Sequence, residues 1–141
     1  MLVAAFDPGL TTGYALADFA ERDDNPIVPF RLIAACALAT PHEVVQWATA
    51  KKPGVLIVED FVGAGPRTRE AIHTLKLVGY LQYLYTNGML TETVRHQPQW
   101  RKAYVALASQ VLREHPTIAY NKHAADALAH IFAYQARMKP T

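Results

Sequence analysis

The chain has a single cysteine, Cys36, among its 141 residues. It therefore cannot form an intramolecular disulfide, and it cannot build a zinc site from several cysteines. Charged residues are scarce at 18%, which argues against intrinsic disorder and against a coiled coil. The hydrophobic content of 51% is sufficient to bury a core, and the length is that of one domain. We expect a single domain over residues 1–141.

Long apolar segments are also missing. No apolar run approaches the roughly 18 residues that a membrane span requires. The opening residues, MLVAAFDPG, carry no charged leader, and their apolar stretch is too short for a signal peptide. These absences predict a protein of the cytoplasm, or of the host cytoplasm if the source is viral, with no membrane partner.

Charge is unevenly distributed, although the formal net charge is only +2. Residues 1–59 carry 4 Lys and Arg against 7 Asp and Glu, whereas residues 60–141 carry 10 against 5. The second half therefore has the positive charge that attracts phosphate groups, and the first half supplies acids. The halves of ordinary proteins also differ by a few charges, so this asymmetry alone identifies no ligand.

The order of the expected elements indicates an α/β protein with a mixed sheet. Short polar turns separate the first three strands, which predicts antiparallel neighbours, and helices alternate with two further strands. Strands are expected at 2–6, 13–19, 30–38, 55–58 and 91–96, and helices at 41–51, 67–85, 99–114 and 122–138. A three-strand antiparallel meander followed by parallel strands, five strands in all and flanked by helices, is the ribonuclease H-like arrangement.

Three carboxylates lie at informative places in this arrangement. Asp7 directly follows the first strand, and Glu59 directly follows the fourth, in LIVED. If these strands are parallel neighbours, both side chains project from one edge, and the last helix can bring Asp126 to meet them. Converging carboxylates repel one another and need a cation, and oxygen ligands suit Mg²⁺ or Mn²⁺. On that helix His123, Asp126 and His130 are spaced i, i+3, i+7 and share one face.

Each residue has an ordinary interpretation when taken alone. Asp7 lies in Asp-Pro-Gly, a common turn. Glu59 could be an exposed acid at a strand end, Asp126 a charge on a helix face, and His130 a packed or surface histidine. The combination favours a functional site, because an unpaired acid buried in an alanine-rich helix would be costly.

The segments AFDPGLTTGYAL, LIVEDF and HAADALAH together resemble the RuvC family of Holliday junction resolvases, and the resemblance covers nearly the whole chain. It implies a ribonuclease H-like nuclease whose divalent metals are held by Asp7, Glu59, His123 and Asp126. His123 stands where many members have a second aspartate. Pro98-Gln99-Trp100-Arg101-Lys102 resembles the segment whose lysine assists cleavage or binds the DNA backbone, which makes Lys102 the matching position.

The function implied by the resemblance is that of a short bacterial or phage-like Holliday junction resolvase. Such a metal-dependent, structure-selective endodeoxyribonuclease cuts four-way DNA junctions by paired symmetric nicks. We expect a homodimer that binds branched DNA and needs no nucleotide cofactor. Two Mg²⁺ ions per active site, for which Mn²⁺ can substitute, would activate a water and stabilise the leaving oxygen. The expected catalytic residues are Asp7, Glu59, His123, Asp126 and Lys102.

The expected DNA-binding residues are mostly basic. Arg67 and Arg69 open the long helix expected at 67–85, where backbone N–H groups also favour phosphate. In RuvC-like enzymes an aromatic residue of the loop after the fourth strand stacks on bases at the junction centre, and the resemblance gives Phe61 that role, although a Phe beside a strand is as often part of the core. Apolar residues of the long helix, such as Leu75, could form the dimer interface or simply cover the sheet. The set is Phe61, Arg67, Arg69, Arg101, Lys102 and Lys122.

The sequence departs from the RuvC pattern after Lys102. The following stretch is shortened, and Ala108 stands where a second lysine is expected, so that Arg95, Arg101 or Lys122 would have to supply the charge. Other functions remain open: a non-resolvase ribonuclease H-like nuclease, or an RNA-processing or RNA-binding relative. A nucleotide-binding fragment like actin-like ATPases also shares DPGxxxTG, but those proteins are far longer.

Overall fold

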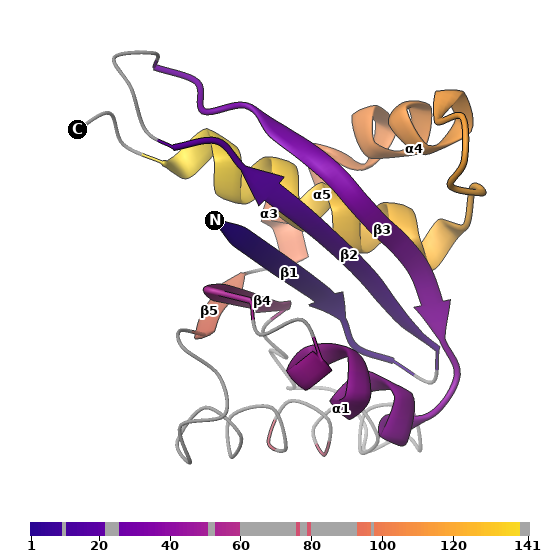
Figure 1. Ribbon diagram of the computed structural model, residues 1–141. Helices are drawn as coiled ribbons and strands as arrows, with labels where there is room; N and C mark the ends of the chain where they lie inside the picture. The colour runs from indigo at the N-terminus through magenta and orange to yellow at the C-terminus, as the bar shows by residue number, and fades with distance from the viewer. Residues whose placement is uncertain are drawn as a thin grey trace.

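The computed structural model describes residues 1–9, 11–21, 26–50, 53–59, 76, 79, 93–96 and 98–138. They form a mixed sheet flanked by helices, which confirms the α/β class expected from the sequence (Figure 1). The strands are β1 (Leu2–Asp7), β2 (Thr12–Phe19), β3 (Phe30–Leu38), β4 (Val55–Glu59) and β5 (Thr93–His96). The helices are α1 (Pro41–Ala50), α3 (Pro98–Lys102), α4 (Val105–Glu114) and α5 (Lys122–Arg137).

The sheet has the strand order β3-β2-β1-β4-β5. The first three strands form the antiparallel meander, whereas β4 is parallel to β1 and β5 is parallel to β4. The register pairs Phe6 with Val58 and Glu59 with His96. As a result Asp7, Glu59 and His96, the last residues of three neighbouring parallel strands, lie at one edge of the sheet. The carboxyl ends of parallel strands are where open α/β sheets bind ligands.

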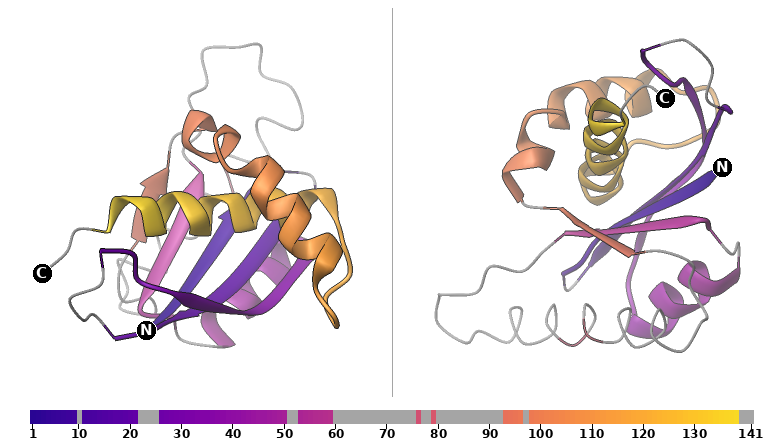
Figure 2. Two further views of the ribbon diagram at one scale, coloured as in Figure 1. Left: turned by 90° about the horizontal axis from the view of Figure 1, so that it is seen from above. Right: turned by 90° about the vertical axis from the view of Figure 1, so that its left-hand side faces the viewer.

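The sheet separates two hydrophobic clusters, because successive side chains of a strand point to opposite faces. Val3 and Ala5 of β1 belong to the cluster that contains the buried residues of α5. Ala4 and Phe6 belong to the cluster with Val44 of α1. Figure 2 shows α3, α4 and α5 on one side of the sheet and α1 on the other. The candidate site residues at the strand ends therefore lie under the α5 layer or beside it.

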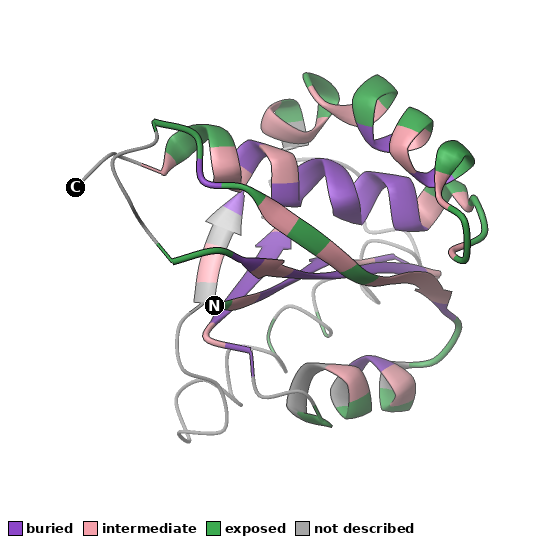
Figure 3. Ribbon diagram, turned by 45° about the horizontal axis from the view of Figure 1, so that its top comes forward, coloured by how far each residue is buried: buried purple, intermediate pink, exposed green. Residues whose placement is uncertain are grey.

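Helix α5 lies very close to β2 because both carry small residues. Its buried face is rich in alanine, and its middle turns are almost fully buried (Figure 3). Asn121 caps the helix, and its Oδ1 accepts hydrogen bonds from the backbone N–H groups of His123 and Ala124. At Gly13 a Cβ would overlap the backbone carbonyl of His123. Only glycine permits this approach, which fixes where α5 crosses the sheet.

We expect Gly13→Ala to destabilise the protein by about 2–4 kcal/mol, because α5 would have to move away from β2. Urea denaturation monitored by circular dichroism measures this change in the free energy of unfolding. Gly54→Ala is the matched control: its Cβ would meet Met1 Cγ at 3.5 Å, an ordinary contact. We expect this control to change stability by less than about 1 kcal/mol. Equal effects of the two substitutions would contradict the proposed close contact.

The helix expected at 99–114 is two helices in the structure. A turn at Ala103 and Tyr104 separates α3 from α4. The Tyr104 N–H bonds the carbonyl of Arg101, and the Tyr104 carbonyl accepts from Ala108 N, each at 2.9 Å. The break has a packing reason, since Tyr104 packs against the cluster around α5. Helical periodicity continues through the turn, so the sequence pattern does not reveal it.

The long helix expected at 67–85 lies outside the described residues, except for Lys76 and Gly79, which are helical and exposed. Phe61, Arg67 and Arg69 also lie outside them, as does Leu75 of the expected dimer interface. Within the described parts of the chain, none of the helices combines the length and apolar character needed to cross a membrane.

Candidate active site

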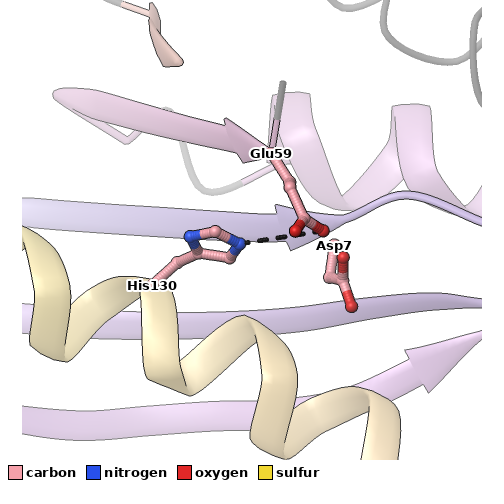
Figure 4. A group of neighbouring side chains, drawn as sticks. All are labelled: Asp7, Glu59 and His130. Atoms are coloured by element: carbon pink, nitrogen blue, oxygen red, sulfur yellow. Dashed lines mark ion pairs between the residues drawn. The ribbon is translucent and has the colours of Figure 1, made fainter. Parts of the chain in front are cut away.

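Asp7, Glu59 and His130 meet at the carboxyl ends of β1 and β4, under α5. Each offers one ligand atom, and these atoms all lie within 4.8 Å of one another (Figure 4). Among the residues that the structure describes, this is the only group of three or more His, Cys, Asp or Glu with such a geometry. The structure thus brings together the two carboxylates that the sequence places at strand ends, and it adds a histidine.

The two carboxylates share the site unequally. Burial and the neighbouring Glu59 raise the pKa of Asp7 to about 9. Burial would also raise the pKa of Glu59, but interactions with His130 and Asp7 and the charge of Arg101 lower it to about 2. In the absence of a metal, the pair therefore carries one negative charge and one proton at neutral pH. A divalent cation would replace that proton and remove the repulsion.

Arg101 connects this pair to the third predicted carboxylate. Its Nε lies 3.2 Å from Glu59 Oε1, and its Nη1 lies 3.2 Å from Asp126 Oδ1. Asp126 is only 9% exposed, so the ion pair supplies the compensation that burial of this acid requires. Arg101 therefore connects Asp126 to Glu59 by two ion pairs.

His130 fits a metal site because the nitrogen that faces the carboxylates has no hydrogen-bond partner. The side chain is fully buried, and Nε2 has no hydrogen-bond partner. Nε2 lies 3.9 Å from Glu59 Oε2, too far for a hydrogen bond. A buried polar atom without a partner calls for an explanation. Two carboxylates and an imidazole form a donor set suited to Mn²⁺ or a similar divalent ion.

The other predicted site residues lie at the margins of this group. His123 is half-buried in the first turn of α5 and does not belong to the group of ligand atoms within 4.8 Å. Its predicted role as a metal ligand stays a prediction. Lys102 and Lys122 are exposed, at the end of α3 and the start of α5.

Sequence reasoning gives too little weight to His130 and overlooks His96. The helical spacing puts His130 on the same face as Asp126, but taken alone it reads as a packed or surface residue. His96 ends β5 as Glu59 ends β4, and that shared position is the signal that could have found it. The two histidines contact each other, Nδ1 to Nδ1 at 3.2 Å.

We expect Arg101→Met to lower the stability of the metal-free protein and to tighten the binding of a metal ion. In chelator it removes the cation that compensates Glu59 and Asp126, and the free energy of unfolding should fall by about 2 kcal/mol. The same loss removes a charge that repels a metal, so Mn²⁺ should bind about tenfold more tightly. Thermal unfolding in EDTA and in Mn²⁺ measures both. Arg113→Met removes an exposed arginine stacked on Tyr120 and is the control. It should change both the stability in EDTA and the affinity for Mn²⁺ much less than Arg101→Met does.

Comparison with known proteins finds the resemblance in structure alone. No family model and no curated protein matches the chain in sequence. Thermus thermophilus RuvC matches with a TM-score of 0.65 at 17% identity over 100% of both chains. The fowlpox virus Holliday junction resolvase matches with a TM-score of 0.67 at 17% identity, covering 98% of this chain and 100% of that one. T. thermophilus RuvC in complex with its Holliday junction substrate matches with a TM-score of 0.62 at 18% identity.

These matches are consistent with the ribonuclease H-like fold expected from the order of the strands and helices. They also agree with the family resemblance carried by the residues around Asp7, Glu59 and Asp126. The chain therefore has the fold of RuvC and of the fowlpox virus Holliday junction resolvase along essentially its whole length.

Proposed function

We propose that this protein is a Holliday junction resolvase, a metal-dependent endodeoxyribonuclease that acts in the cytoplasm. The observation that carries the proposal is the group of Asp7, Glu59 and His130, whose ligand atoms lie within 4.8 Å at the sheet edge. The likeness of the whole chain to two resolvases gives this group its chemical context. A divalent-ion site on such a fold fits hydrolysis of a phosphodiester bond.

In this proposal, Asp7, Glu59 and Asp126 hold two divalent ions, with His123 as a further ligand, as the resemblance implies. When bound, these ions supply water activation and stabilisation of the leaving 3′ oxygen. Glu59 is ionised at neutral pH because His130, Asp7 and Arg101 lower its pKa to about 2, so it is ready to bind a cation. Asp7 must lose its proton when a cation binds, since its own pKa is raised to about 9.

The basic residues around the site orient the DNA backbone in this proposal. Lys102 is exposed and directly follows Arg101, so its ammonium group is free to approach a phosphate near the carboxylates. Lys122 is exposed at the first residue of α5, next to His123. Arg67, Arg69 and Phe61, which lie outside the described residues, would contact the junction from the adjoining segment. The positive charge of residues 60–141 accords with a polyanionic substrate.

A dimer is part of the proposal because a junction is resolved by two symmetric cuts. One protomer supplies one group of carboxylates, so paired nicks require two copies related by a two-fold axis. The long helix expected at 67–85 would provide the interface. Size-exclusion chromatography with light scattering should find a dimer at micromolar concentration, and one dimer should bind one junction.

The decisive experiment offers the protein a synthetic four-way junction, a duplex DNA of the same sequence and an RNA–DNA hybrid, each in Mg²⁺ and in Mn²⁺. We expect paired nicks in the junction and little cleavage of the duplex. Preferential cleavage of the hybrid would instead indicate a different ribonuclease H-like nuclease. Binding of RNA without any cleavage would indicate an RNA-binding relative, and either result would overturn the proposal.

A further inference from the structure

Two buried histidines lie beneath the carboxylates. His96 at the end of β5 is 1% exposed, and His130 of α5 is fully buried. Their Nδ1 atoms are 3.2 Å apart, within hydrogen-bond distance. A neutral imidazole carries one N–H, so in this contact one Nδ1 donates and the other accepts. The choice between the two arrangements decides what His130 presents on its other side.

That other side faces the carboxylates. In Figure 4 the ring of His130 points toward Glu59, with Asp7 beside it. If His96 donates, His130 carries its proton on Nε2. If His130 donates through Nδ1, its Nε2 presents a lone pair to the site. Nε2 has no hydrogen-bond partner, and its contact with Glu59 Oε2 is long, at 3.9 Å, so that a metal ion bound between the two groups would replace it.

We propose that His130 Nε2 is a metal ligand together with Asp7 and Glu59, and that His96 is the positioning residue that accepts the His130 Nδ1 proton. A hydrogen bond to the second ring nitrogen is how proteins commonly fix the tautomer and orientation of a ligating histidine. An imidazole nitrogen favours Mn²⁺ over Mg²⁺, because Mg²⁺ takes oxygen ligands and later divalent metals bind nitrogen more tightly.

The surroundings of His96 keep its ring in the orientation that this role requires. β5 pairs His96 with Glu59 in parallel register, which ties the backbone of the positioning residue to that of a carboxylate ligand. The ring of Trp100 meets the ring of His96 edge to face, with centroids 5.1 Å apart. Arg137 from the end of α5 lies over the ring of Trp100, 3.9 Å from its centroid. The imidazole of His96, at the end of β5, is thus held by Trp100 of α3 on one side and by His130 of α5 on another.

This inference rests on the metal site of the proposed function but not on the DNA that the protein cuts. It also distinguishes the roles of two histidines. The family resemblance assigns a nitrogen ligand to His123, whereas the geometry assigns one to His130. Metal binding to the whole protein without DNA therefore tests it directly.

The first measurement is pulsed electron paramagnetic resonance of the Mn²⁺-loaded protein, which detects nitrogen bound to the metal. We expect nitrogen modulation in the wild type, a clear decrease of its depth in His130→Gln and the retention of the His130 contribution in His123→Gln. Modulation of undiminished depth in His130→Gln, or its disappearance in His123→Gln, would overturn the assignment. An absence of Mn²⁺ binding would overturn it as well. Junction cleavage measured on the same samples shows separately whether the proposed function holds.

The second measurement tests His96 through metal affinity. By calorimetry, His96→Leu should weaken Mn²⁺ binding by about 10–100-fold and Mg²⁺ binding by less. His96→Asn places an amide oxygen where Nδ1 accepts, and it should restore Mn²⁺ affinity to within about threefold of the wild type. His42→Asn, at an exposed histidine of α1, is the matched control and should bind both ions normally.

Unfolding in chelator shows whether each variant is folded, so a collapsed core is not mistaken for a lost hydrogen bond. A folded His96→Leu protein that binds Mn²⁺ like the wild type would overturn the positioning role. If His96→Leu does not fold, the His96→Asn and His123→Gln variants carry the test: nitrogen modulation must persist in both.

Discussion

Asp7→Asn should reduce junction cleavage by about 1,000-fold or more while making the metal-free protein more stable. The loss of cleavage follows from the loss of a carboxylate at the centre of the proposed metal site. The gain in stability follows from the raised pKa of Asp7, about 9, which burial and Glu59 cause. At pH 7 the folded protein must either hold a proton on Asp7 or bear a repulsive charge. An amide removes that cost, and we expect a gain of about 1–2 kcal/mol in EDTA.

The pH dependence of stability identifies the same residue. Because the carboxyl is protonated more readily in the folded state, Asp7 favours folding most below the unfolded pKa of 3.8, and this contribution is lost as the pH rises toward 9. The Asp7 contribution to the stability of the metal-free wild type should therefore fall between about pH 4 and 9. Asp7→Asn should remove most of that slope, and Mn²⁺ should flatten it in the wild type.

Asp18→Asn provides the matched control for Asp7→Asn. Asp18 is a partly exposed residue of β2, and its carboxylate pairs with the N-terminal ammonium group at 3.1 Å. We expect normal cleavage and a change in stability of less than about 1 kcal/mol. Junction binding should persist in Asp7→Asn, or even tighten, because a negative charge facing phosphate is lost. Cleavage at a normal rate by Asp7→Asn would show that the metal site is misassigned.

Glu59→Gln should abolish cleavage to a similar extent but change stability in the opposite direction. Glu59 is the carboxylate that remains ionised, with a pKa lowered to about 2 by His130, Asp7 and Arg101 against the effect of burial. The ionised form stabilises the folded protein above the unfolded pKa of 4.5, and this contribution disappears as the pH falls toward 2. The glutamine removes it and leaves Arg101 with Asp126 alone. We expect a loss of about 1–3 kcal/mol at pH 7.

The contrast between the two variants is the sharpest test of the site's electrostatics. Both lose activity, whereas denaturation in EDTA should show one protein stabilised and the other destabilised. Glu114→Gln is the control, since Glu114 is exposed at the end of α4, where it accepts a hydrogen bond from Gln110. If Asp7→Asn and Glu59→Gln shift stability in the same direction, the metal-free pair does not hold its proton on Asp7 and its negative charge on Glu59.

The sequence by itself is sufficient to predict the strands of the sheet and the proximity of two carboxylates, Asp7 and Glu59. Alternating apolar residues and turn signals are local patterns, so the strands around Val3, Ala15 and Ile57 can be found from short windows. Parallel neighbours end at one edge, and this rule alone predicts that Asp7 and Glu59 lie together. The tight approach of α5 at Gly13 leaves no such pattern, because one glycine at the start of a strand has many explanations.

Only the tertiary structure decides what surrounds those carboxylates. Arg101 reaches both Glu59 and Asp126 because the chain turns at Ala103 and Tyr104, and that turn interrupts no helical periodicity. The contact between His96 and His130 joins residues 34 positions apart, on a strand and a helix whose relative placement depends on packing. A histidine on an apolar helix face has the same sequence pattern whether it fills the core or faces a metal site. Neighbouring side chains, which a linear pattern does not contain, decide between the two.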